Sequence, residues 1–162
     1  MIPYSKQSIS KKDTLAVLKV LRSNFLTQGP TVKMFEEKIC KFTKAKFAVA
    51  CNNGTSALHL ACLALNLQKG DIVWTVPNTF VATANCVLNC GGIIDFVDID
   101  TEDFNISIHE LEKKLKLAKK KKKLPKIVIP VHLGGQPTDQ KKIWQLSKKY
   151  NFKVIEDASH SI

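Results

Sequence analysis

The chain has 162 residues, of which 44% are apolar and 24% are charged. This composition supports one folded core and excludes wholesale disorder, which requires low hydrophobicity together with high charge. No stretch approaches the roughly 20 apolar residues of a membrane span, and the opening residues include no apolar signal segment. We therefore expect a cytoplasmic protein with no membrane partner.

The net charge of +11 comes largely from one segment. Residues 113–126 contain nine lysines and no acidic residue, and without these nine the net charge falls to +2. The run Lys119–Lys123 includes no aromatic residue, and the chain has a single arginine. Nucleic-acid sites usually combine basic and aromatic side chains, so a solvated helix end is favoured over a nucleic-acid-binding module. Both interpretations stay open at this point.

The five cysteines are odd in number and lie within apolar runs. None forms a CxxC pair, so the sequence indicates neither a disulfide framework nor a zinc site. Cys86 and Cys90 are four residues apart, but buried thiols are favoured over a metal site there. We expect no bound metal.

The elements predicted in chain order begin with two helices. Residues 10–21 have helical apolar spacing, with Ser10 as N-cap and Asp13 three residues later. A second helix is expected to open at Thr31, after Pro30. Short β-rich runs then alternate with helical segments. The strands are expected at 47–51, 72–76, 93–97, 127–131 and 152–155, and the helices at 55–67, 79–89, 107–120 and 138–150.

Strands that are apolar on both faces and alternate with helices predict an α/β fold. The expected architecture is a mostly parallel sheet with helices on both faces, in three layers (αβα). In such sheets ligands bind beyond the carboxyl ends of the strands. Polar and glycine residues follow all five predicted strands, so one site can gather them.

Four features at these strand ends point to a ligand. Gly54, Thr55 and Ser56 open a helix after the first strand, as in a phosphate-binding turn, although an ordinary turn with a Thr or Ser N-cap fits equally well. Phe80 can stack on a flat ring or pack in the core. Asp157 follows an apolar strand, where an unpaired carboxylate is costly, and it is otherwise a surface or capping residue. His160 can be a second contact to the ligand or a histidine without a functional role.

Taken together, these features match one cofactor better than any of them does alone. Pyridoxal phosphate needs an anchored phosphate, a ring held flat, and a carboxylate that keeps the pyridine nitrogen protonated. The segment Gly54–Ser56 matches neither the dinucleotide-binding fingerprint nor the P-loop. The sequence therefore favours pyridoxal phosphate over NAD or ATP.

The sequence also resembles the DegT/DnrJ/EryC1/StrS family of sugar-nucleotide aminotransferases. This resemblance implies the pyridoxal-phosphate-dependent transferase fold type I. It places Gly54, Thr55 and Ser56 at the cofactor phosphate, Phe80 against the ring, Asp157 at the ring nitrogen and His160 near the ring hydroxyl. The matching segments, in family order, are residues 24–30, 35–37, 53–60, 78–85, 96–99 and 155–160.

Within the family, residues 2–9, 26–30 and 82–88 are most similar to the 4-aminotransferases of pseudaminic acid biosynthesis. That resemblance implies transfer of an amino group from L-glutamate to the 4-keto carbon of UDP-2-acetamido-2,6-dideoxy-β-L-arabino-hex-4-ulose. It also implies a homodimer. The positions that match nucleotide-sugar contacts are Tyr4, Asn24, Phe25, Leu26 and Thr27.

The family's Schiff-base lysine is expected beyond residue 162, so no catalytic residue is assigned in this chain. Residues 1–30 are expected on the substrate side and residues 31–162 in the N-terminal part of an incomplete large domain. The small C-terminal domain is expected to be absent, and the chain by itself is expected to be inactive and to bind the cofactor weakly. Three alternatives stay open: a relative with another keto sugar or a dehydratase with histidine in place of lysine, the nucleic-acid-binding module, and a non-catalytic remnant.

Overall fold

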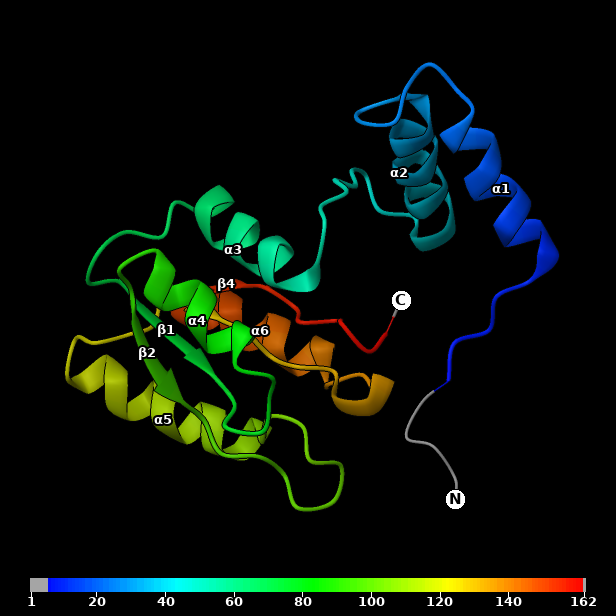
Figure 1. Cartoon of the computed structure of the whole chain (residues 1–162). Helices are drawn as coiled ribbons and strands as arrows, with labels where there is room; N and C mark the ends of the chain where they lie inside the picture. Colours follow the sequence, from blue (N-terminus) through cyan, green and yellow to red (C-terminus); the bar gives the residue numbers. More distant parts are fainter. Residues whose placement is uncertain (1–5, 162) are drawn as a thin grey trace. The chain divides into compact units, whose positions relative to one another are not determined.

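The computed structural model describes residues 6–161 and divides into two compact units, Met1–Ala50 and Cys51–Ile162. Figure 1 shows helices in the first unit and a sheet with its helices in the second. The boundary expected after residue 30 stays a prediction.

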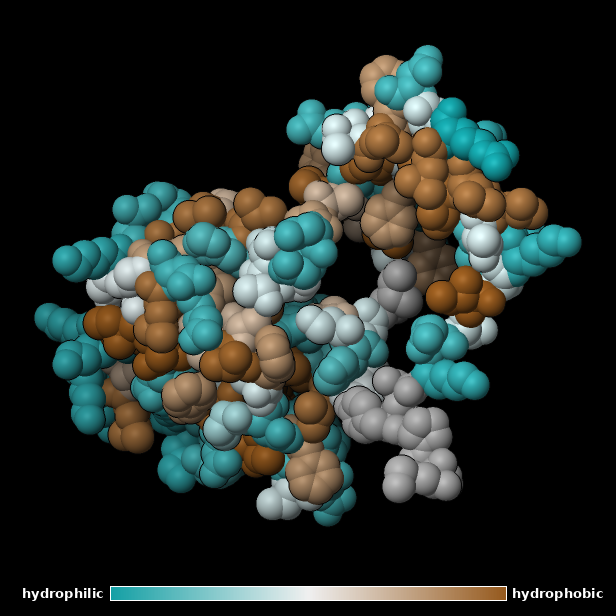
Figure 2. Space-filling model, viewed as in Figure 1, coloured by the Kyte–Doolittle hydropathy of each residue, from teal (hydrophilic) through white to brown (hydrophobic). Residues whose placement is uncertain are grey.

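The N-terminal unit consists of α1 (Lys11–Leu21) and α2 (Pro30–Thr43). The predicted capping box is confirmed, because the Asp13 amide donates to Ser10 Oγ and the Ser10 amide donates to Asp13 Oδ2. α2 begins with Pro30 at its first position, one residue before the predicted start. Neither helix has a buried residue, and Figure 2 shows many apolar atoms on the surface of this unit.

The strand predicted at residues 47–51 is wrong. This segment is irregular, and Phe47 and Val49 are 76% and 80% exposed. The Ala50 amide donates to a side chain, Oε1 of Glu36, at 2.8 Å rather than to a neighbouring strand. A strand needs a hydrogen-bonded partner, and no other strand among the described residues pairs with this segment.

The C-terminal unit contains a four-stranded parallel sheet in the order β2-β1-β3-β4. The strands are β1 (Ile72–Thr75), β2 (Ile93–Phe96), β3 (Ile127–Val128) and β4 (Lys153–Val154). An isolated parallel bridge between Val131 and Asp157 continues the β3–β4 pairing beyond the strands themselves. The other four predicted strands are thus confirmed, with shorter bounds.

Helices cover both faces of this sheet, which confirms the predicted three layers (Figure 1). The helices α3 (Gly54–Ala64) and α4 (Ala82–Asn89) pack on one face, and α5 (Ile108–Lys120) and α6 (Gln140–Tyr150) pack on the other. Adjacent residues of β1 pack into the cores on opposite faces of the sheet, because successive side chains of a strand point to opposite faces. Val73 packs with Cys62 and Cys86 of α3 and α4, and Trp74 packs with residues of α5 and α6.

The lysine run lies at the end of α5, and Lys119–Lys123 are exposed. Other lysines near it form ion pairs, including Lys114 with Asp95 at 2.7 Å and Lys126 with Asp71 at 2.5 Å. This arrangement supports the interpretation as a solvated helix end. Within residues 6–161, no helix combines the length and apolarity that crossing a membrane requires.

Candidate functional site

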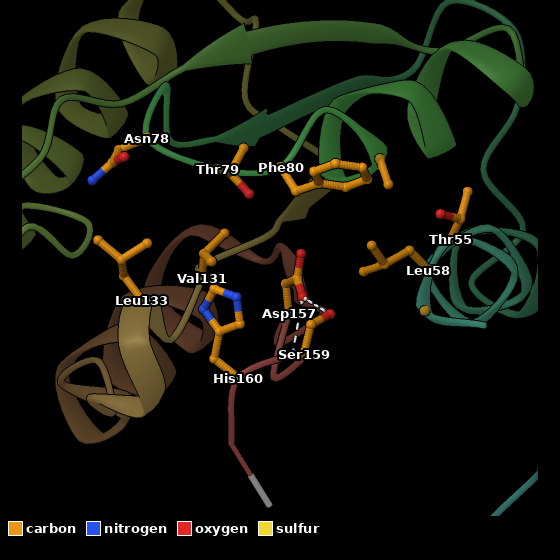
Figure 3. A pocket seen from close by; sticks show the side chains of 12 residues that line it. Thr55, Leu58, Asn78, Thr79, Phe80, Val131, Leu133, Asp157, Ser159 and His160 are labelled. Atoms are coloured by element: carbon orange, nitrogen blue, oxygen red, sulfur yellow. Dashed lines mark hydrogen bonds between the residues drawn. The ribbon is translucent and has the colours of Figure 1, made fainter. Parts of the chain in front are cut away.

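The carboxyl ends of the strands border a cavity of about 440 Å³ in the C-terminal unit. All strands are parallel, so the segments that follow β1, β3 and β4 emerge at the same edge. Figure 3 shows Thr55 and Leu58 on one side of the cavity, and Asn78 and Leu133 on the other. The lining residues are Gly54, Thr55, Leu58, Asn78, Thr79, Phe80, Ala82, Val131, Leu133, Asp157, Ser159 and His160.

Asp157 is a buried acid with 5% of its surface exposed, so it is not the surface residue that the sequence left open. Its backbone is fixed beside β3, because its amide donates to Pro130 O at 2.9 Å and its carbonyl accepts from the His132 amide at 3.1 Å. Its carboxylate accepts from Thr83 Oγ1 at 2.6 Å, and from Ser159 Oγ and the Ser159 amide at 2.7 and 3.2 Å. Three donors therefore offset the cost of burying this charge.

The amino end of α3 lies at the cavity with Gly54 and Thr55 in its lining. Asn53 is the N-cap, since its Oδ1 accepts the Ser56 amide at 2.8 Å, so the alternative of a Thr or Ser cap is wrong. Within the described residues, the amides of Gly54 and Thr55 have no acceptor. They lie at the positive end of the helix dipole, where an anion binds well. Ser56 does not line the cavity.

Phe80 is not a core residue, which corrects the second interpretation that the sequence left open. Its side chain is 75% exposed and lines the cavity. Figure 3 shows the ring on the opposite side of the cavity from His160, with Asp157 between the two. An exposed aromatic ring beside a buried carboxylate can stack on a flat ligand ring.

His160 also lines the cavity, and its ring is held by a backbone donor. The Gly134 amide donates to Nδ1 at 3.2 Å, so Nε2 carries the proton of the neutral ring. Gly134 belongs to a short 3₁₀ turn, Leu133–Gly135, which the buried Asn105 fastens at both ends. Asn105 Oδ1 accepts from the Leu133 amide at 3.1 Å, and Nδ2 donates to Gln136 O at 3.1 Å.

Sequence reasoning missed Thr79, Thr83 and Ser159, which complete the surroundings of Asp157. Thr83 is fully buried in α4, and its Oγ1 lies 2.7 Å from Thr79 Oγ1. A polar residue in an otherwise apolar helix face was the available signal for Thr83. That signal does not identify the carboxylate that accepts the hydrogen bond from Thr83, which lies 74 residues further along the chain.

The predicted sugar contacts lie elsewhere in the chain. Asn24, Phe25, Leu26 and Thr27 form the connection between α1 and α2 in the N-terminal unit, where Phe25 and Leu26 are 59% and 67% exposed. Tyr4 lies outside the described residues. Their proposed role stays a prediction.

Two cysteines lie behind the site as buried apolar residues. Cys62 Sγ and Cys86 Sγ are 3.7 Å apart, and both side chains are fully buried and free. The shared hydrogen bond with Cys86 and burial raise the pKa of Cys62, so it remains a neutral thiol. Across residues 6–161, no group of three or more His, Cys, Asp and Glu residues is placed to hold a metal ion.

Comparison with known proteins gives consistent matches along the chain. The sequence pattern of the DegT/DnrJ/EryC1/StrS aminotransferase family matches residues 7–162. The UDP-4-amino-4,6-dideoxy-N-acetyl-β-L-altrosamine transaminase of Campylobacter jejuni is 42% identical over 162 residues, which cover 100% of this chain and 42% of that protein. The chain spans about two fifths of the length of the curated relatives that it matches first, 40% and 42%.

Solved structures of aminotransferases share the fold. Helicobacter pylori PseC, an aminotransferase involved in the biosynthesis of pseudaminic acid, matches with a TM-score of 0.86 and 33% identity, over 98% of this chain and 42% of that one. NtdA from Bacillus subtilis, solved with bound cofactor PMP, matches with a TM-score of 0.84 and 32% identity, over 95% of this chain and 35% of that one. These matches confirm the predicted fold class, the α/β fold of the type I pyridoxal-phosphate enzymes.

Proposed function

Because the chain belongs to the DegT/DnrJ/EryC1/StrS aminotransferase family, we propose that its C-terminal unit binds pyridoxal phosphate in the cavity at the strand ends. Enzymes of this family depend on that cofactor, and NtdA was solved with its amino form, PMP. The observation that carries the proposal is the buried Asp157 carboxylate, which reaches a cavity bordered by an exposed aromatic ring and the amino end of a helix.

The residues around the cavity fit the separate parts of this cofactor. Asp157 would receive the protonated ring nitrogen, and Phe80 would stack on the ring. The free amides of Gly54 and Thr55 would bind the phosphate, with the Thr55 hydroxyl as a further donor, whereas the predicted contact from Ser56 is not part of this proposal because Ser56 lies outside the cavity lining. When bound, pyridoxal phosphate supplies an electron sink for moving a proton and an amino group.

His160 would donate from Nε2 to the ring hydroxyl, because its Nδ1 is already occupied by the Gly134 amide. A neutral donor at this position holds the ring in its plane without adding charge to the site. The role of His160 is thus set by the turn that contacts it.

We propose amino transfer to a nucleotide-linked keto sugar as the reaction of the whole protein. The names of the Campylobacter jejuni relative and of PseC support a UDP-linked 4-keto-6-deoxy-N-acetylhexosamine as acceptor in pseudaminic acid biosynthesis, and we propose L-glutamate as the donor. Tyr4 and the segment from Asn24 to Thr27 would contact the nucleotide sugar. Residues 31–162 would belong to the cofactor-binding domain and residues 1–30 to the substrate side.

We also propose a homodimer in the cytoplasm, with no nucleic-acid or membrane partner. Both helices of the N-terminal unit lack buried residues and expose large apolar side chains, as a protein-binding surface does. Sedimentation equilibrium would test the dimer. A monomer at all concentrations would contradict it.

Cofactor binding is the first experiment, with pyridoxamine phosphate as the probe. This form has no aldehyde and does not couple to the many lysines of the chain. We expect measurable binding by calorimetry, and a loss of about tenfold or more in Asp157→Asn, since a hydrogen bond to a charged group contributes about 1.5–3 kcal/mol. His160→Gln, which keeps a neutral donor, is expected within about threefold of the native chain. Equal binding by Asp157→Asn and the native chain would contradict the site.

Amino transfer is a separate test, measured as 2-oxoglutarate formed from L-glutamate in the presence of the UDP-linked keto sugar. We expect the whole protein to form 2-oxoglutarate only when both substrates are present. Absence of turnover with this sugar would contradict the proposed acceptor.

A further inference from the structure

We propose that Thr83 is a positioning residue for the cofactor ring, and that Oδ2 of Asp157, rather than Oδ1, receives the ring N–H. This inference rests on the proposed function. It adds a buried residue outside the cavity lining and assigns one carboxylate oxygen to the ligand.

The direction of the hydrogen bonds follows from the chemistry of the groups. An ionised carboxylate only accepts, so the hydroxyl of Thr83 donates to Oδ2 of Asp157 across 2.6 Å. A hydroxyl has one proton, so the contact of 2.7 Å between Thr79 Oγ1 and Thr83 Oγ1 must be donated by Thr79. The result is a one-way chain from Thr79 through Thr83 to Asp157.

The acceptor positions of the carboxylate show where a ligand can bind. Two oxygens offer about four lone-pair positions. The Ser159 hydroxyl and amide both donate to Oδ1, at 2.7 and 3.2 Å, and Thr83 occupies one position on Oδ2. The remaining position is on Oδ2. In Figure 3 the oxygen without dashed lines to Ser159 points toward the side of the cavity where Phe80 and Thr79 lie.

Thr83 and the ring nitrogen would therefore share one oxygen. Because Thr83 is fully buried, water does not compete for its hydroxyl, and the carboxylate is held in one orientation. Removal of the hydroxyl leaves Oδ2 without its fixed donor, so that only the two Ser159 donors at Oδ1 still orient the carboxylate. The loss should then appear only for ligands that have a ring N–H.

The experiment compares Thr83→Val with the native chain, using two probes. The first is pyridoxamine phosphate, and the second is its 1-deaza analogue, in which CH replaces the ring nitrogen. We expect Thr83→Val, which keeps the shape but not the hydroxyl, to bind pyridoxamine phosphate about tenfold more weakly. Binding of the deaza analogue should change by less than about twofold, since it has no N–H for Oδ2. Thr83→Ser is the matched control and should restore binding of pyridoxamine phosphate.

Thr79→Val gives a second test that leaves the buried hydroxyl in place. We expect a smaller loss of about threefold, again only for pyridoxamine phosphate, because the outer donor polarises the Thr83 hydroxyl. This variant decides the question if Thr83→Val does not fold, as judged by circular dichroism.

Two outcomes would overturn the inference. Equal loss for both probes in Thr83→Val would mean that Thr83 only maintains the local packing. Unchanged binding of pyridoxamine phosphate would mean that Oδ2 does not depend on Thr83. Failure of the native chain to bind either probe would instead overturn the proposed function, so the two failures are distinguishable.

Discussion

The imidazole of His132, 3% exposed, lies 3.3 Å from the carboxylate of Glu156, with Nε2 facing Oε2. Its Nδ1 accepts the Thr138 amide at 3.1 Å, so the proton of the neutral ring is on Nε2 and points to Glu156. Gln140 Nε2 donates to the same carboxylate oxygen at 3.0 Å. His132 thus links the segment after β3 to the residue next to Asp157.

We predict that His132→Ala destabilises the fold by about 2–4 kcal/mol, because it leaves a cavity and an unpaired backbone amide at Thr138. Urea unfolding followed by circular dichroism measures this change. The control is His109→Ala, since the His109 side chain is 85% exposed and its loss should cost less than about 0.5 kcal/mol. Similar effects of the two substitutions would refute a structural role for His132.

Two substitutions of Asn53 distinguish helix capping from anion binding at the amino end of α3. Asn53→Ala removes the acceptor for the Ser56 amide and should lower the free energy of unfolding by about 1 kcal/mol. Asn53→Asp retains the cap, so its stability should stay near that of the native chain, but its charge lies beside the expected phosphate. Calorimetry with pyridoxamine phosphate should therefore show weaker binding in Asn53→Asp, and undiminished binding would argue against a phosphate at this helix end.

Gly135 has a φ of +87°, and a Cβ there would lie 2.9 Å from the backbone oxygen of His160. Gly70 has the same φ, but nothing lies within 4 Å of its Cβ position. Alanine at either position should cost about 1–2 kcal/mol for the left-handed backbone. Only Gly135→Ala should also weaken binding of pyridoxamine phosphate, because it displaces the segment that carries His160. Equal affinities in the two variants would show that this close contact does not position the site.

Asp71, at the amino end of the central strand β1, makes the stability of the fold depend on acid pH. Hydrogen bonds from Lys126 and from the Gln68 amide lower the pKa of Asp71 below its ordinary value of 3.8. The contribution is therefore complete above the unfolded pKa and is lost as the pH falls through the lower folded value. At neutral pH the free energy of unfolding of the native chain should exceed that of Asp71→Asn by up to about 1 kcal/mol. The difference is small because the Asp71–Lys126 pair is partly exposed. At about pH 3 the two chains should differ less in their free energy of unfolding. A difference that does not change with pH would contradict the contribution of the lowered Asp71 pKa.

Local sequence patterns were sufficient to predict the features that depend on neighbours within a few residues. The capping box of Ser10 and Asp13, the helices α1 to α6 and the strands β1 to β4 follow from local spacing and periodicity. Because parallel strands end at one edge of a sheet, the pattern also indicated that Gly54, Phe80, Asp157 and His160 could share a site, and all four line one cavity.

How these residues are held depends on contacts between distant parts of the folded chain. The strand order β2-β1-β3-β4 brings Thr83 to Asp157 across 74 residues, and no local pattern encodes that pairing. The predicted strand at 47–51 fails for the same reason, because its apolar residues meet the local requirement but no described strand completes its hydrogen bonds. Periodicity reports which face of a segment is apolar, whereas hydrogen bonding between distant segments depends on which neighbours the fold supplies.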